Sequence, residues 1–210
     1  MSKIQRELFF SVPFFYFDVE DSNKLNSELV SDILKWREED KEGINRSNKS
    51  GWHSTIDMHL KEEFHKITKA INNAQEKLSI AENYHSDWSL LVESMWANVS
   101  PKYAHNSFHT HPNSLWSGVY YVQCPKDCGI IKFPNTSSHW RLPMYSDDKT
   151  VGEQPHQWDS VFYEPIEGRI ILFPSDTGHE VMQNLTDVEG DDGYRISISF
   201  NSIQEHKGNL

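Results

Sequence analysis

From residue 87 onward the sequence is a series of short runs rich in β-branched and aromatic residues, each bounded by turn residues. The runs are DWSLLVESMWANVS, SLWSGVYYVQ, GIIKFP, RIILFP and YRISISFN. Such runs are typical of β-strands, and no helical stripe follows residue 84. Many short strands joined by turns predict a mainly β sandwich or barrel, with the preceding helices packed outside it.

The first half of the chain predicts two amphipathic helices. In SNKLNSELVSDILKWREED apolar residues recur at four-residue spacing, with Asp21 or Ser22 as the N-cap. In LKEEFHKITKAINNAQEKL a single apolar stripe comprises Leu60, Phe64, Ile67, Ile71, Ala74 and Leu78. The polar segment EGINRSNKSGWHST between them is expected to be loop.

We expect one domain over residues 1–210, with a helical part at about 20–83 and a β core at about 87–202. The apolar start MSKIQRELFFSVPFFYFD is broken by Pro13 and lacks a cleavage pattern, so it predicts a first strand, not a signal peptide. Residues 137–160 are polar and predict a long insertion loop.

Charge and composition exclude several functions. The net charge is −11 and no Lys/Arg block exceeds a pair, which argues against nucleic-acid phosphates as the main target. The apolar stretches are far short of the ~20 residues that cross a bilayer. The two cysteines, Cys124 and Cys128, have no second pair to complete a zinc site and fit ordinary thiols in a reducing cytoplasm.

The segment HNSFHTHPNS contains the most informative polar residues. In an extended chain, residues two apart project from the same side, so His109 and His111 can offer both imidazoles to one metal. His179 follows the run RIILFPS and can supply a third ligand, whereas His105 is not needed. Neutral imidazoles suit iron, zinc, copper or nickel. The alternative is a set of surface or hydrogen-bonded histidines without a metal.

A second polar set lies in the last run, YRISISF. There Arg195, Ser197 and Ser199 fall on one face and the apolar residues on the other. A guanidinium fork with a nearby hydroxyl can bind a carboxylate bidentately. Otherwise Arg195 reaches solvent or pairs with an acid.

These motifs together resemble a known family. The order of HTHPNSLWSGVYYV, GRIILFPSDTGHEV and YRISISFN is similar to that of the iron- and 2-oxoglutarate-dependent oxygenases, and more narrowly to a small bacterial and phage group of them with an HxHPxS pattern. The resemblance covers about residues 95–201. It implies a double-stranded β-helix (a jelly-roll, cupin-like fold), a cytoplasmic enzyme of a bacterial or phage-infected cell, and Fe(II) and 2-oxoglutarate as cofactors.

The resemblance also implies roles for individual residues. His109 and His179 become iron ligands, and Arg195 with Ser197 holds the far carboxylate of 2-oxoglutarate. Asn98 and Tyr103 precede the histidines and are candidate cofactor contacts. This sequence departs from the family at His111, where most members have Asp or Glu; His111 either ligates iron or leaves a place for water, and we expect ligation.

The implied activity is that of a dioxygenase that hydroxylates a substrate which the sequence does not identify. Two alternatives stay open at this point. One is a three-histidine, cupin-type dioxygenase or isomerase that does not use 2-oxoglutarate, in which the arginine binds the substrate's own carboxylate. The other is a non-enzymatic β-sandwich with an incidental histidine cluster.

Overall fold

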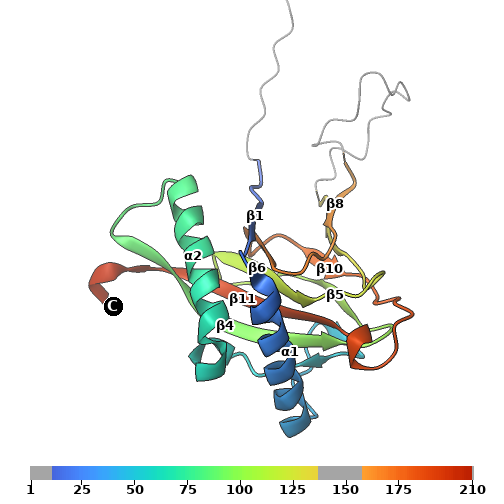
Figure 1. The fold of residues 1–210 in the computed structure, drawn as a ribbon. Coiled ribbons are helices and arrows are strands. Elements are labelled where there is room, and N and C mark those ends of the chain that lie inside the picture. The colour runs from blue at the N-terminus through green and yellow to red at the C-terminus, as the bar shows by residue number, and fades with distance from the viewer. Residues whose placement is uncertain (1–10, 137–157, 210) are drawn as a thin grey trace, which may run out of the picture.

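Two antiparallel β-sheets face each other, and two helices cover the outer face of the larger sheet (Figure 1). The computed structural model describes residues 11–136 and 158–209. The helices are α1 (Ser22–Glu39) and α2 (His65–Ala81). The mainly β fold with flanking helices that the sequence predicts is confirmed.

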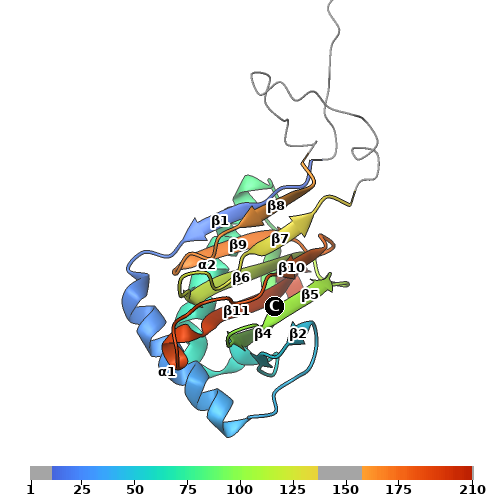
Figure 2. The same ribbon diagram turned by 90° about the vertical axis from the view of Figure 1, so that its right-hand side faces the viewer.

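The larger sheet has the order β1-β9-β6-β11-β4-β3, and the smaller has the order β2-β5-β10-β7-β8. Figure 2 shows the smaller sheet lying over the larger one. The strands of the larger sheet are β1 (Phe15–Asp18), β9 (Arg169–Pro174), β6 (Trp116–Gln123), β11 (Arg195–His206), β4 (Trp88–Ser100) and β3 (Trp52–His53). Those of the smaller sheet are β2 (Asn48–Lys49), β5 (His105–His109), β10 (His179–Val181), β7 (Ile131–Pro134) and β8 (Ser160–Tyr163).

Strand β11 lies between β4 and β6 in the larger sheet. Its two faces contact different layers of the molecule. Its apolar residues Ile196, Ile198 and Phe200 join the core beneath the helices. Its alternate residues face the smaller sheet, because successive strand side chains point to opposite faces. The facing pattern that YRISISF predicts is therefore present.

The helices bury one stripe each against the larger sheet. In α1 the stripe contains Leu29 and Ile33, and in α2 it contains Ile67, Ile71, Ala74 and Leu78, all in one core with β4, β6 and β11. The Tyr120 hydroxyl on β6 donates to the Asn26 side chain of α1 over 2.5 Å. The adjacent Tyr121 faces the other sheet, as alternation along a strand requires.

Two local predictions were wrong. The second helix begins at His65 rather than Leu60, because Lys61 is extended (φ −90°, ψ 136°) and separates the 3-10 turn at Met58–Leu60 from the one at Glu62–Phe64 that leads into the helix. Leu60 is 72% exposed. The segment at 42–55, expected to be loop, contains β2 and β3, which pair with β5 and β4. Strands of two residues are too short to show a periodic pattern.

Other expectations meet the structure only in part. Asp21 is the N-cap of α1, but its side chain makes no capping hydrogen bond. Most of the predicted insertion loop at 137–160 lies outside the described residues, as do residues 1–10 of the predicted first strand. Neither α1 nor α2, the α-helices of the described part, is long and apolar enough to cross a membrane.

Candidate metal centre

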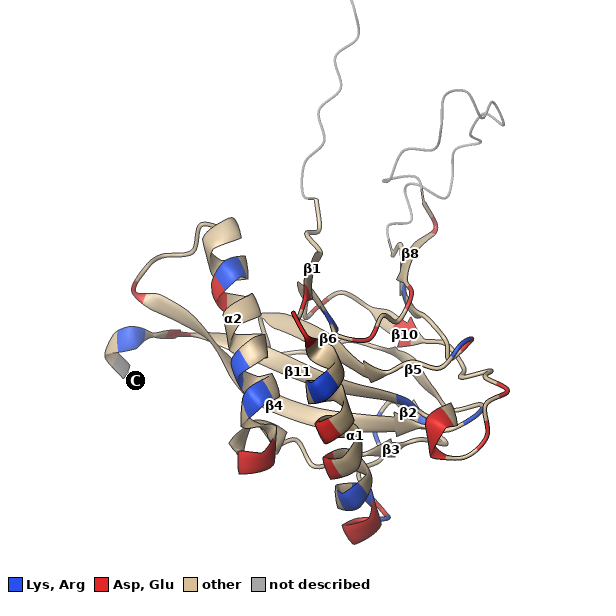
Figure 3. Cartoon of the chain, in the orientation of Figure 1, with Lys and Arg blue, Asp and Glu red and all other residues tan. Residues whose placement is uncertain are grey.

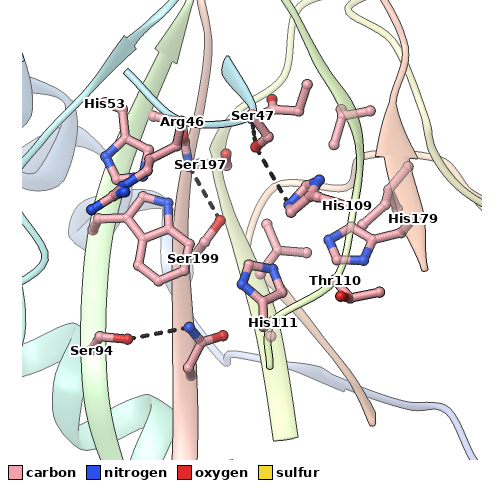
Figure 4. A pocket seen from close by; sticks show the side chains of 18 of the residues that line it. Arg46, Ser47, His53, Ser94, His109, Thr110, His111, His179, Ser197 and Ser199 are labelled. Carbon is pink, nitrogen blue, oxygen red and sulfur yellow. Dashed lines mark hydrogen bonds between the residues drawn. The ribbon is translucent and has the colours of Figure 1, made fainter. Parts of the chain in front are cut away.

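Pairing between β5 and β10 brings two histidines together that lie far apart in the sequence. His109 is directly opposite His179 in the register of the two strands, and their ring centroids are 4.3 Å apart. His111 lies just after the end of β5, where its backbone N–H donates to the Ser175 carbonyl over 2.9 Å. The candidate ligand atoms of the three side chains all lie within 4.8 Å of one another. The structure therefore brings the three predicted ligands to one place (Figure 4).

Hydrogen bonds fix which ring nitrogen of two of these histidines is free. Nδ1 of His109 is 2.7 Å from the Ser107 carbonyl, and Nδ1 of His179 is 3.0 Å from the Thr177 carbonyl. A carbonyl can only accept, so Nδ1 must carry the proton in both rings. Nε2 is then left with a lone pair, as is usual in metal-binding histidines whose other ring nitrogen donates a hydrogen bond to the protein. The Ser47 hydroxyl lies 3.5 Å from Nε2 of His109.

Burial keeps all three imidazoles neutral. It lowers the pKa of His109, and together with the nearby His109 ring it lowers the pKa of His111 to about 4 and that of His179 to about 3. At neutral pH each ring therefore has one unprotonated nitrogen, and a metal can bind it without displacing a proton. A cluster of three neutral imidazoles fits a divalent transition metal such as Fe(II).

The three histidines open onto a cavity of about 700 Å³ between the two sheets. Strands β4 and β11 form one wall through Trp96, Asn98, Arg195, Ser197 and Ser199. Apolar side chains line it nearer His179, namely Val119, Ile131, Phe173 and Val181. The volume is within the range of about 300–1,000 Å³ usual for small-molecule sites.

Arg195 is 2% exposed and has no acidic partner among the described residues. Its Nη1 donates to the backbone carbonyls of Cys128, Gly129 and Met182, the last over 3.0 Å. Its Nη2 is buried without a hydrogen-bond partner in the described part of the protein. Desolvation lowers the pKa of this guanidinium, but arginine stays charged in proteins. An unpaired, buried cationic donor beside the three histidines fits a ligand that carries a carboxylate.

Ser197 and Asn98 lie directly opposite each other on β11 and β4, and both line the cavity. The Asn98 amide nitrogen donates to Ser199 over 3.2 Å, while its oxygen is buried without a partner. Of the cofactor residues that the sequence suggests, the structure therefore brings Arg195, Ser197 and Asn98 to the histidines.

Tyr103 is not brought to this site. It lies in the turn before β5 at φ 71°, its side chain is 59% exposed, and it does not line the cavity. The sequence placed it near the ligands because it precedes them closely, but the left-handed turn directs it outward. His105, which was not expected to be a ligand, lies outside the cluster.

Sequence reasoning missed several cavity residues, and four of them bear on the chemistry of the site. Tyr121 is buried beside Arg195, and its burial raises the pKa of its hydroxyl; the alternation of Tyr120 and Tyr121 left open which of them faces the site. Arg46 and His53 come from the segment expected to be loop, and Trp96 from β4. No motif marks these three residues, because sheet pairing places them there.

Comparisons with known proteins agree with this geometry. The family described as "Putative 2OG-Fe(II) oxygenase" matches residues 94–201, about half of the 210-residue chain. The chain belongs to this family. No curated protein sequence matches it.

Several solved structures share the fold. A prolyl-4-hydroxylase of Pseudomonas putida matches with a TM-score of 0.60 and 15% identity, over 90% of this chain and 92% of that one. The epimerase SnoN, solved with Fe3+, alpha ketoglutarate and nogalamycin RO, matches with a TM-score of 0.64 and 11% identity, over 92% of this chain and 81% of that one. HygX of Streptomyces hygroscopicus, solved with nickel, 2-oxoglutarate and hygromycin B, matches with a TM-score of 0.57 and 12% identity, over 91% of this chain and 82% of that one.

At these identities the structural matches identify the fold, a double-stranded β-helix. Membership of the family identifies the chain as an iron- and 2-oxoglutarate-dependent oxygenase. The cupin-type enzyme without 2-oxoglutarate and the non-enzymatic sandwich are therefore set aside. The roles of individual residues are proposals.

Acid should destabilise the metal-free protein, and His179 should account for part of the loss. An unfolded histidine takes up a proton near pH 6.5, whereas folded His179 does so only near 3. The unfolded state thus binds more protons between these values, and stability falls as the pH falls below about 6.5. We expect His179→Asn to reduce the slope of the unfolding free energy against pH by up to about 1.4 kcal/mol per pH unit. Urea unfolding with a chelator present measures this slope. His105→Asn is the control, and equal slopes for His179→Asn and the wild type would contradict the expectation.

Proposed function

We propose that His109, His111 and His179 bind Fe(II), that Arg195 anchors 2-oxoglutarate beside it, and that the chain oxidises a primary substrate held in the rest of the cavity. The observation that carries this proposal is the buried Arg195, which has no acidic partner in the described residues and has Nη2 unpaired in the same cavity as the three histidines. When bound, iron with 2-oxoglutarate and dioxygen supplies oxidative chemistry in which decarboxylation to succinate is coupled to oxidation of the substrate. The protein binds, orients and shields the reactants.

In this proposal His109 and His179 bind the metal through Nε2, because their Nδ1 protons are held by backbone carbonyls. His111 completes a facial set of three, which leaves the other coordination positions for cosubstrates. The Ser47 hydroxyl beside Nε2 of His109 then has to release that nitrogen when metal binds. Since His111 is neutral, the site holds one more positive charge than the commoner version with a carboxylate.

The far carboxylate of 2-oxoglutarate is proposed to pair with Arg195. Nη1 is already committed to backbone carbonyls, so it fixes the guanidinium plane while Nη2 meets the ligand. Ser197 and the Tyr121 hydroxyl are further donors for the carboxylate. Asn98 can join them if its amide is turned over, because Ser199 can then donate to its oxygen and the amide nitrogen is freed.

The apolar wall near His179 excludes water from the reacting groups. Phe173 and Phe133 pack against the His179 ring with centroids 4.8 and 5.6 Å away. Exclusion of water strengthens the electrostatic contacts within the site and limits side reactions of reactive species.

We also propose that the chain is a single domain, because one apolar core joins both helices to the larger sheet. The unbridged Cys124 and Cys128 support a reducing cytoplasm as its location. The net charge of −11 argues against a nucleic-acid substrate.

Removing the imidazole of either His109 or His179 should abolish stoichiometric iron binding. His109→Ala and His179→Ala each take one of three ligands from the site, which removes a large part of its affinity. His105→Ala, in the same strand as His109 but outside the cluster, is the matched control and should bind iron normally. Anaerobic titration with Fe(II), read by metal analysis after desalting, measures this. A requirement for His105 equal to that for His109 would show that the ligand set is wrong.

Replacement of His111 by aspartate should keep iron bound. His111→Asp restores the commoner carboxylate, with some loss of geometry because its side chain is shorter. His111→Ala should bind iron more weakly than either form. The same titration compares the three proteins. A folded but metal-free His111→Asp protein beside an intact His111→Ala would show that His111 has a different role.

Arg195→Ala should raise the Kd for 2-oxoglutarate while iron still binds. Loss of one partner of a buried charge pair costs about 3–5 kcal/mol, or more than a hundredfold in affinity. Arg195→Lys should recover only part of this, because an ammonium lacks the bidentate fork. Calorimetry on the iron-loaded protein under nitrogen measures it, with Arg169→Gln as the control, since Arg169 pairs with Asp18 at the surface. Equal affinities in wild type and Arg195→Ala would refute the cosubstrate assignment.

A further inference from the structure

We infer that Arg46, with His53 and Trp96, binds a carboxylate or phosphate group of the primary substrate, and that this substrate is a small polar anion. The inference rests on the proposed function, since it assigns the part of the cavity that iron and 2-oxoglutarate leave free.

The floor of the cavity is longer than 2-oxoglutarate. Along β11 the residues Arg195, Ser197, Ser199 and Asn201 all line the cavity. Strands rise about 3.3–3.4 Å per residue, so this row extends over roughly 20 Å. A five-carbon diacid anchored at Arg195 covers only the first part of that length. The far part, floored by Asn201 and the facing Ser94, remains for a second molecule. From there that molecule extends over Trp96, opposite Ser199, toward His53, which pairs with Asn98.

Trp96 provides a flat surface next to the metal ligands. Its ring centroid lies 5.8 Å from that of His111, and the His53 ring stacks on it with centroids 5.3 Å apart and an interplanar angle of 8°. A molecule that rests against Trp96 is thus beside the proposed metal. Figure 4 shows Arg46 and His53 together on one side of the cavity, across from the three histidines.

Arg46 supplies a positive charge that nothing in the described structure neutralises. Its backbone N–H bonds Asn48, but its side chain forms no ion pair within residues 11–136 and 158–209. None of the described residues that line the cavity is acidic, although the chain has 31 Asp and Glu against 20 Lys and Arg. Many of the acidic residues belong instead to the helices and to loops, and β6 has no charged residue (Figure 3).

The loaded site would keep a positive charge. Because His111 is neutral, no ligand in the set offsets the charge of ferrous iron. Iron, Arg195 and Arg46 together carry more positive charge than the two carboxylates of 2-oxoglutarate neutralise. Arg46 is exposed at the edge of the cavity, and an anionic group of the primary substrate that contacts it reduces this excess.

His53 indicates that the ligand also carries a hydrogen-bond donor. Its Nδ1 lies 2.6 Å from the Ser54 carbonyl, so Nδ1 carries the proton and Nε2 is an acceptor. Nε2 has no partner among the described residues. The matching ligand has an N–H or O–H donor close to its anionic group. With about 700 Å³ shared between two molecules, and a net charge of −11 that repels polyanions, the ligand is a small molecule rather than a nucleic acid.

Calorimetry with three matched probes tests this inference. Hippurate has a carboxylate next to an N–H and a planar ring, hippuramide is its neutral amide, and the phosphonate analogue of hippurate replaces the carboxylate. Each is titrated into anaerobic protein saturated with Fe(II) and 2-oxoglutarate. We expect at least one anionic probe to bind roughly tenfold more tightly than hippuramide. Arg46→Gln should remove this preference, and the favoured anion tells carboxylate from phosphate substrates.

Lys49→Gln is the matched control, because it removes the same charge from the adjacent strand β2 without touching the cavity. It should keep the preference, and both variants should bind 2-oxoglutarate as the wild type does. A preference that survives Arg46→Gln, or no preference in the wild type, would overturn the inference. So would a loss of 2-oxoglutarate affinity in Arg46→Gln, because Arg46 would then belong to the cosubstrate site. Failure of the wild type to bind 2-oxoglutarate would instead refute the proposed function.

Discussion

The guanidinium of Arg195 is buried without an acidic partner in the described structure, and much of the site is arranged around it. A buried cation is costly unless its donors are satisfied. The turn before β7 meets part of that need with the Cys128 and Gly129 carbonyls. Gly129 has φ 91°, and a Cβ there would lie 2.7 Å from Nη1, so this approach requires glycine. The remaining nitrogen, Nη2, is buried without a partner in the described residues, and in the proposed function it binds the far carboxylate of 2-oxoglutarate.

The position of Arg195 is fixed by β11, which pairs with β4 and β6 along the centre of the larger sheet. One face of β11 is anchored in the helix-covered core, so the polar face cannot rotate away from the cavity. The histidines belong to the other sheet, where the β5–β10 register sets His109 against His179. The backbone N–H of His111 donates to the carbonyl of Ser175, just after β9, and this hydrogen bond joins the segment after β5 to the larger sheet. The three histidines and Arg195 are thus held by different sheets around one cavity.

The strongly periodic parts of the sequence predicted the structure best. Alternation in YRISISF predicted both faces of β11, and the HxH spacing predicted that His109 and His111 share a site. Pairing between distant segments leaves no local pattern, so the strands at 48–53 and the cavity residues Arg46 and His53 were missed. Tyr103 was misassigned because nearness in sequence says little where a left-handed turn intervenes.

The most direct test of the account is a crystal structure of the protein loaded anaerobically with Fe(II) and soaked with 2-oxoglutarate. We expect one metal bound by Nε2 of His109, Nε2 of His179 and a ring nitrogen of His111, with the far carboxylate of 2-oxoglutarate on Nη2 of Arg195. Metal bound elsewhere, or 2-oxoglutarate oriented with neither carboxylate at Arg195, would contradict it.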